Sequence, residues 1–237
     1  MEFNDLIDKI TCMDCIEGMK QIPDNSIDLV VTDPPYGINY VSNHSKNKEY
    51  RKKVADTTEW DKNYNLKRDF PFDELWRIMK ENSHMYVFTR WDVLSLLPKP
   101  KNVIVWWKKD SAGGMGDLNF WGHSFEMIAV YEKGRRKING SRVNVIPTNY
   151  VQNNFHMLHP TMKDIKIILP LLTASSKEGD IILDPFMGSG TTAVACRMLN
   201  RHFIGFEISK EYCDIANNRL KKYMEQTKLT GVLNDGN

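Results

Sequence analysis

Continuous apolar runs of strand length, separated by helical patterns, constrain the fold of this chain most strongly. Such runs are typical of parallel strands whose two faces are both covered by helices. The predicted strands are residues 27–32, 84–89, 103–107, 125–131, 180–183 and 202–206. The predicted helices are residues 15–21, 72–81, 162–175, 191–200 and 210–226. This alternation predicts an α/β fold with a doubly wound, mostly parallel sheet.

Length and composition indicate a single globular domain. With 237 residues, of which 41% are hydrophobic, the chain can bury a full core. Polar stretches without predicted elements interrupt the alternation at residues 39–68, 110–123 and 134–158. Loops of this length inside a compact domain are usually functional. We therefore predict one domain over residues 1–237, with candidate binding inserts at 41–69 and 134–158.

Several classes of protein are excluded by the sequence. No run of about 18 apolar residues is present, so no membrane span is expected. The N-terminus lacks the apolar segment of a secretory signal. Neither the histidines nor the cysteines, which are Cys12, Cys15, Cys196 and Cys213, show metal-binding spacing. The sequence thus predicts a cytoplasmic protein with reduced thiols and no metal.

Basic residues are concentrated in the middle of the chain. Residues 41–142 carry 20 Lys and Arg against 13 Asp and Glu, whereas residues 1–40 carry 2 against 8. A basic insert of this kind is typical of a polyanion-binding surface, although a solvated lysine-rich surface explains the charge equally well. The candidate nucleic-acid contacts are Lys46, Lys48, Arg51, Lys52, Lys53, Arg135, Arg136, Lys137 and Arg142.

Residues 181–192 (IILDPFMGSGTT) predict a buried strand, a glycine-rich turn and the start of a helix. Gly188 and Gly190 allow a ligand to approach the backbone closely, and the helix start exposes free N–H groups. Glu207 ends the next predicted strand, where a ribose diol would lie in a nucleotide-binding fold. A phosphate-binding Gly-Lys-Ser/Thr is absent, and Asp184 would repel a pyrophosphate. The turn therefore favours an adenosyl cofactor without phosphates, with a simple helix cap as the structural alternative.

Residues 29–36 (LVVTDPPY) predict a second strand that runs into a rigid turn. The two prolines remove backbone donors, so the turn offers only acceptors, from the Asp33 carboxylate and the Pro34 carbonyl. Acceptors beside the ring of Tyr36 suit a planar base with an exocyclic NH₂ group. The alternative is a rigid turn in which Tyr36 merely packs.

Together the two motifs resemble those of the DNA amino-methyltransferases, which methylate adenine N6 or cytosine N4 with S-adenosylmethionine. DPPY precedes DPFMGSGTT here, which is the permuted order of the group called β. Further similar segments are MDCIEGM (13–19), EWDK (59–62), Trp107-Lys108, Glu126 and HPTMK (159–163). Two positions depart from the family pattern, since Asp164 replaces a usual Pro and Met13 a common Gly.

The resemblance implies a Rossmann-like S-adenosylmethionine-dependent methyltransferase fold, with a mostly parallel seven-stranded sheet and an antiparallel hairpin near one edge. It implies that Asp14 binds the cofactor's adenine and Glu207 its ribose. The implied catalytic residues are Asp33, Pro34, Pro35 and Tyr36. The implied cofactor-binding residues are Asp14, Cys15, Asp33, His159, Thr161, Lys163, Asp184, Pro185, Phe186, Gly188, Ser189, Gly190, Thr191 and Glu207.

The activity implied is direct methylation of a flipped adenine at a short site in duplex DNA. The acid of DPPY favours adenine, because the cytosine-N4 branch more often has Ser there; cytosine N4 and RNA are the alternatives. No cysteine follows a proline, which argues against the thiol-dependent C5 chemistry. A stand-alone, phage-borne or restriction-modification role is implied, with a homodimer or a cognate restriction endonuclease as expected partners. A binding module without activity would lack a motif residue, and none is missing.

Overall fold

A computed structural model describes residues 2–37, 63–109, 124–140, 143–149 and 162–234, with the side chains of the last helix described to Thr227. The helices are α1 (Phe3–Leu6), α2 (Cys15–Met19), α5 (Leu66–Asp69), α6 (Phe72–Ile78), α7 (Ile165–Ser175), α8 (Thr191–Met198) and α9 (Lys210–Asn234), with a 3₁₀ turn, η1, at Leu94–Leu96. The strands are β1 (Lys9–Cys12), β2 (Ile27–Thr32), β3 (Met79–Thr89), β4 (Asn102–Lys109), β5 (Phe125–Lys133), β6 (Val145–Asn149), β7 (Ile181–Asp184) and β8 (His202–Glu207).

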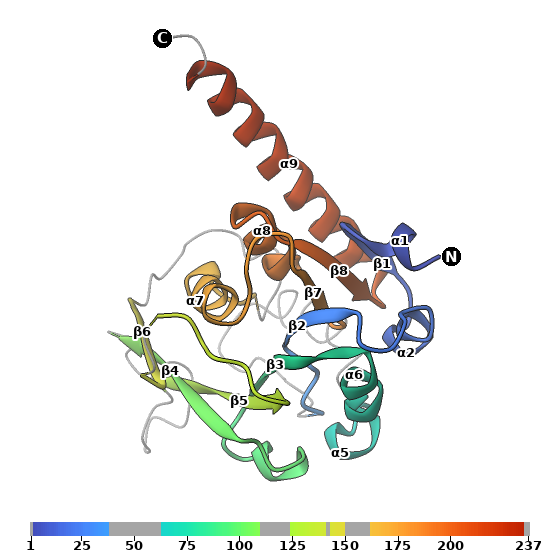
Figure 1. The fold of residues 1–237 in the computed structure, drawn as a ribbon, viewed down its shortest axis with the longest axis vertical. Coiled ribbons are helices and arrows are strands. Elements are labelled where there is room, and N and C mark those ends of the chain that lie inside the picture. Colours follow the sequence, from blue (N-terminus) through green and yellow to red (C-terminus); the bar gives the residue numbers. More distant parts are fainter. Residues whose placement is uncertain (1, 38–62, 110–123, 141–142, 150–161, 235–237) are drawn as a thin grey trace, which may run out of the picture.

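These strands form one sheet in the order β1-β8-β7-β2-β3-β5-β4-β6 (Figure 1). Neighbours are parallel throughout, except that β5 runs antiparallel to both β3 and β4. The predicted mostly parallel α/β fold is confirmed, with eight strands in the described chain rather than seven. Sequence patterns did not predict β1 or β6, because each edge strand buries a single residue and so shows no apolar run.

Helices cover both faces of the sheet, and each face has its own core (Figure 1). β2 shows why its central residues are apolar: Val30 packs into the core with α2 and α6, whereas Leu29 and Val31 pack into the core with α7, α8 and α9. Alternate side chains of a strand point to opposite faces, so a strand covered on both sides carries a nearly continuous run of apolar residues.

Two helix boundaries differ informatively from the predictions. α7 begins at Ile165 rather than at Met162, because Asp164 caps it: Asp164 Oδ1 accepts from the Lys166 N–H at 2.9 Å. This cap accounts for an acid where the family pattern has Pro. α9 continues to Asn234, past residue 226, where the predicted helix ends. None of the helices in the described ranges is both long and apolar enough to cross a bilayer.

Candidate active site

Four neighbouring parallel strands, β1, β8, β7 and β2, bring acids to one edge of the sheet. Glu207 and Asp184 are the last residues of β8 and β7, Asp33 directly follows β2, and Asp14 lies just beyond β1. The prediction that Asp184 and Glu207 end neighbouring strands is therefore confirmed. Chain order reverses between β7 and β2, and such a switch point is where open α/β sheets bind ligands.

The glycine turn after β7 is held closely against α9. Gly190 is the N-cap of α8 with φ +80°, and a Cβ added there would lie 3.0 Å from the Cβ of Ala216. Gly188 also has a positive φ, +53°. Both the left-handed backbone and the close packing therefore require glycine at position 190.

Asp184 is 4% exposed, and its side chain accepts hydrogen bonds from residues of this turn and of α8. Its Oδ2 accepts from Thr192 Oγ1 at 2.7 Å, and its Oδ1 accepts from the Phe186 N–H at 3.2 Å. Burial raises the pKa of Asp184 to about 7, although these donors oppose the shift. The side chain of Asp184 is thus engaged within the protein, and its predicted contact with a cofactor stays a prediction.

Glu207 is the half-buried acid of the site. Its Oε2 accepts from the Gly188 N–H and its Oε1 from the Ser209 N–H, both at 2.8 Å. These two bonds fix the plane of the carboxylate, while each oxygen retains a lone pair for a further donor. Burial raises the pKa of Glu207. Ile208, which the sequence did not single out, is 63% exposed beside it and offers an apolar surface.

Asp14 and Cys15 lie next to Glu207 at the start of α2. The Met13 N–H donates to the Glu207 carbonyl at 3.0 Å, which joins the end of β1 to the end of β8. Asp14 is the N-cap of α2, and its Oδ1 accepts from the N–H groups of Ile16 and Glu17. Asp14 thus has a structural role in addition to any contact with a ligand.

The Asp-Pro-Pro-Tyr turn follows β2. Tyr36 donates its hydroxyl hydrogen to Asp33 Oδ1 at 2.5 Å, so the ring is fixed to the acid that it follows in sequence. Gly37 closes the turn with φ +69°, and a Cβ there would lie 2.2 Å from the carbonyl oxygen of Tyr64. Gly37 is not among the predicted site residues, although a glycine directly after a rigid turn is a recognisable signal.

Lys163 is the second partner of Asp33. Its Nζ lies 2.6 Å from Asp33 Oδ2 and 3.3 Å from Glu126 Oε2, and the lysine side chain is only 12% exposed. Lys108 Nζ binds the other oxygen of Glu126. The strand register explains the contact, because β5 pairs with β3 and so brings Glu126 to the edge where Asp33 lies.

The charges of this network determine its protonation. Burial raises the pKa of Asp33, and Lys163 opposes that shift. For Glu126, burial acts in the same direction, but Lys163 and Lys108 outweigh it and lower the pKa. Lys163, which is predicted to bind the cofactor, thus pairs with the acid of the Asp-Pro-Pro-Tyr turn.

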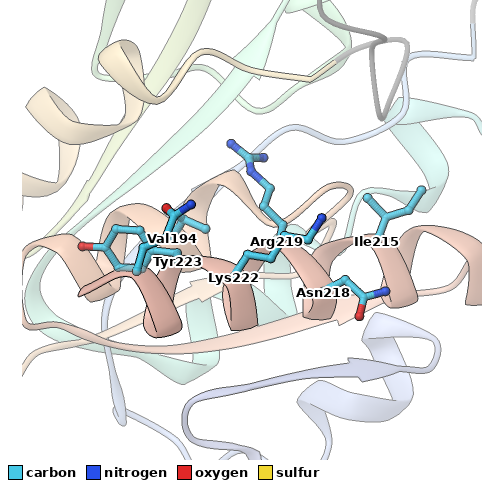
Figure 2. A pocket seen from close by; sticks show the side chains of 7 residues that line it. Val194, Ile215, Asn218, Arg219, Lys222 and Tyr223 are labelled. Atoms are coloured by element: carbon cyan, nitrogen blue, oxygen red, sulfur yellow. The ribbon is translucent and has the colours of Figure 1, made fainter. Parts of the chain in front are cut away.

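A cavity of about 430 Å³ lies elsewhere, lined by residues of α9 and by Val194 of α8 (Figure 2). Its lining includes Arg219, whose side chain rises from the helix, and none of the predicted site residues. Arg219 Nη1 donates to the Ser189 carbonyl at 3.2 Å and to Thr191 Oγ1 at 2.9 Å. Arg219 therefore supports the glycine turn from α9.

Comparison with known proteins decides the family. Residues 27–218 match the N6/N4 methyltransferase family model, which is described as DNA methylase. The chain belongs to this DNA methylase family.

One relative and two solved structures illustrate the likeness. The type II methyltransferase M.HpaI of Haemophilus parainfluenzae is 31% identical over 244 residues, which cover 90% of this chain and 74% of M.HpaI. The M1.HpyAVI–SAM complex has 24% sequence identity and a TM-score of 0.64, covering 90% of this chain and 98% of its own. The cytosine-N4-specific PvuII DNA methyltransferase has a TM-score of 0.65 at 14% identity, covering 91% and 89%. The two structures share the fold of this DNA methylase.

Three buried thiols of this DNA methylase, those of Cys15, Cys196 and Cys213, are unsuited to nucleophilic attack. Burial raises the pKa of Cys15 to about 12 and that of Cys213 to about 11, and it raises the pKa of Cys196 well above its usual range. A thiol needs its thiolate to act as a nucleophile. In the described ranges, no cluster of His, Cys, Asp and Glu is arranged to hold a metal.

The predicted nucleic-acid residues of the DNA methylase are only partly described. Three of them, Arg135, Arg136 and Lys137, follow β5. The last residue of β5, Lys133, pairs with Ser83 of β3, just before the main run of β3 residues that pair with β2. The three basic residues therefore lie at the opposite end of the sheet from Asp33, and Arg136 pairs with Asp180 at 3.4 Å. Their predicted contact with nucleic acid stays a prediction. Outside the described residues lie Lys46, Lys48, Arg51, Lys52, Lys53, Arg142, His159 and Thr161.

Proposed function

We propose that this DNA methylase transfers a methyl group from S-adenosylmethionine to N6 of adenine in duplex DNA. The observation that carries the proposal is the fixed acceptor turn at the end of β2. Tyr36 and Lys163 orient the two oxygens of Asp33, and Asp184 ends the neighbouring strand. A base bound at Asp33 would therefore lie beside a cofactor bound at β7 and β8.

The residues present fit an adenosyl cofactor. The Glu207 carboxylate is held by two backbone N–H groups and can still accept from ribose hydroxyls. Ile208 would cover one face of the adenine. The turn at Gly188 and Gly190 presents backbone without side chains, as close approach of a ligand requires. Asp184 and Arg219 would contribute by holding this turn.

The protein's part in the chemistry is to hold the target amine. One amine N–H would donate to Asp33 and the other to the Pro34 carbonyl, which frees the nitrogen lone pair from conjugation with the ring. S-adenosylmethionine would supply an activated methyl group, and the electrons of its carbon–sulfur bond would stay on sulfur. The methylated amine would then release one proton to water. Alignment of this kind can supply about 7–11 kcal/mol of the barrier.

The acid at position 33 supports adenine as the target, by resemblance to the adenine-specific branch. The turn's geometry treats both amines alike, so cytosine N4 is the alternative product. We propose further that residues 1–237 act as one catalytic domain, with inserts at 41–69 and 134–158. Residues 145–149 of the second insert form β6. Type II relatives such as M.HpaI support a short recognition site in a restriction-modification setting.

The test is methyl transfer from labelled S-adenosylmethionine to duplex DNA, single-stranded DNA and RNA in parallel. We expect label in duplex DNA with the wild-type protein and none with Asp33→Ala. Label only in RNA would contradict the proposed substrate. Equal transfer by Asp33→Ala would contradict the proposed site.

A further inference from the structure

Lys163 joins two carboxylates that have different positions in the site. Its Nζ lies 2.6 Å from Asp33 Oδ2 and 3.3 Å from Glu126 Oε2. The other Asp33 oxygen accepts the Tyr36 hydroxyl at 2.5 Å. Both oxygens of Asp33 therefore already accept from a donor, and one of these donors carries a full positive charge.

A target amine requires the same carboxylate. In the proposed reaction the amine nitrogen gains positive charge, because the methyl group arrives before a proton leaves. An ammonium group on the same carboxylate would lie close to that nitrogen and oppose the charge. This electrostatic repulsion is strong because Lys163 and Asp33 are largely shielded from water, with side chains 12% and 22% exposed. Rapid transfer therefore requires the ammonium to leave Asp33.

Glu126 is built to receive it. Glu126 comes from β5, and a small rotation of the lysine side chain would complete its contact with Oε2. Lys108 binds the other oxygen, and its Nζ lies 4.6 Å from the centre of the buried Trp106 ring. This lysine orients the Glu126 carboxylate and keeps it charged. The Phe88 ring, 5.3 Å from Lys163 Nζ, lies beneath the moving group.

We propose that Glu126 is a positioning residue, which takes the ammonium group of Lys163 away from Asp33 when the target amine binds. Before the base enters, Lys163 keeps Asp33 charged and oriented. Afterwards Glu126 holds that positive charge away from the reacting nitrogen. No proton changes place in this step. The role rests on the proposed function, which assigns Asp33 to the amine.

The first test replaces Glu126 with Gln, which keeps its shape and removes its charge. With saturating S-adenosylmethionine and duplex DNA, E126Q should lower kcat at least about tenfold. Its Kd for the cofactor should stay within about twofold, and E126D should recover most of the turnover. The matched control is E132Q, on the same strand. Glu132 pairs with Lys101, far from Asp33, so E132Q should keep kcat within about twofold.

A second comparison separates positioning from structural support. In a K163Q background, adding E126Q should change kcat by less than about twofold, because no ammonium is left to hold. A structural role would cost the same in both backgrounds. Any of three results would overturn the role. These are equal losses of kcat in both backgrounds, wild-type turnover in E126Q, and lower turnover in K163Q than in E126Q. A wild-type protein that methylates no DNA would instead contradict the proposed function, and this role with it.

Discussion

Substituting Gly190 with Ala tests whether the glycine turn is locked against α9. Its φ of +80° costs an L-residue roughly 1–2 kcal/mol. The new Cβ would lie 3.0 Å from the Cβ and 3.2 Å from the Cα of Ala216, and overpacking of this kind adds roughly 1–3 kcal/mol. Alanine also lowers the conformational entropy of the unfolded chain, which stabilises the folded state by roughly 0.4–1 kcal/mol. We expect Gly190→Ala to lower the free energy of unfolding by roughly 3 kcal/mol.

Gly179 provides the matched control. It has nearly the same φ, +79°, but an added Cβ would meet nothing within 4 Å. Gly179→Ala should therefore cost only the backbone strain, roughly 1 kcal/mol. Urea unfolding of both variants, followed by circular dichroism, measures the difference. Equal losses in the two variants would refute the close packing of the turn on α9.

Three further predictions concern the acids of the site. Asp33→Ala should lower kcat at least about 100-fold while the cofactor Kd stays within a few fold, as transfer and binding assays can show. Glu207→Gln should weaken cofactor binding roughly 10-fold or more by calorimetry, whereas Glu211→Gln, an exposed neighbour, should not. Asp184, with its pKa raised from 3.8 to about 7, stabilises the fold most when protonated. Relative to Asp184→Asn, the wild-type protein should therefore lose stability as pH rises from about 4 to 7, by on the order of 4 kcal/mol. A pH-independent difference in urea unfolding would contradict this.

The sequence predicted those features that depend on neighbouring residues. Leu29, Val30 and Val31 of β2 are apolar in succession because both faces of the strand are buried, so a local pattern reveals the strand. The turn before Thr191 is recognisable because glycine adopts its left-handed backbone without steric cost. Asp33, Asp184 and Glu207 each lie at the end of an apolar run, and parallel strands end at a common edge of the sheet. These features required no knowledge of long-range contacts.

The contacts of Lys163 could not be predicted in the same way. Asp33, Glu126 and Lys163 are far apart in the sequence and meet only because β5 inserts antiparallel between β3 and β4. The same reversal carries Arg136 to the opposite end of the sheet, where it pairs with Asp180. Composition shows how many basic residues the middle of the chain has, but strand direction determines which end of the sheet they occupy.

Identification of the methylated nucleoside tests the central claim most directly. Unmethylated duplex DNA would be incubated with the wild-type protein and S-adenosylmethionine, digested to nucleosides and analysed by mass spectrometry, with Asp33→Ala as the control. We predict N6-methyladenine, produced by the wild-type protein and not by the variant. N4-methylcytosine as the product would contradict the adenine assignment, and N6-methyladenine produced equally by Asp33→Ala would contradict the role of the turn.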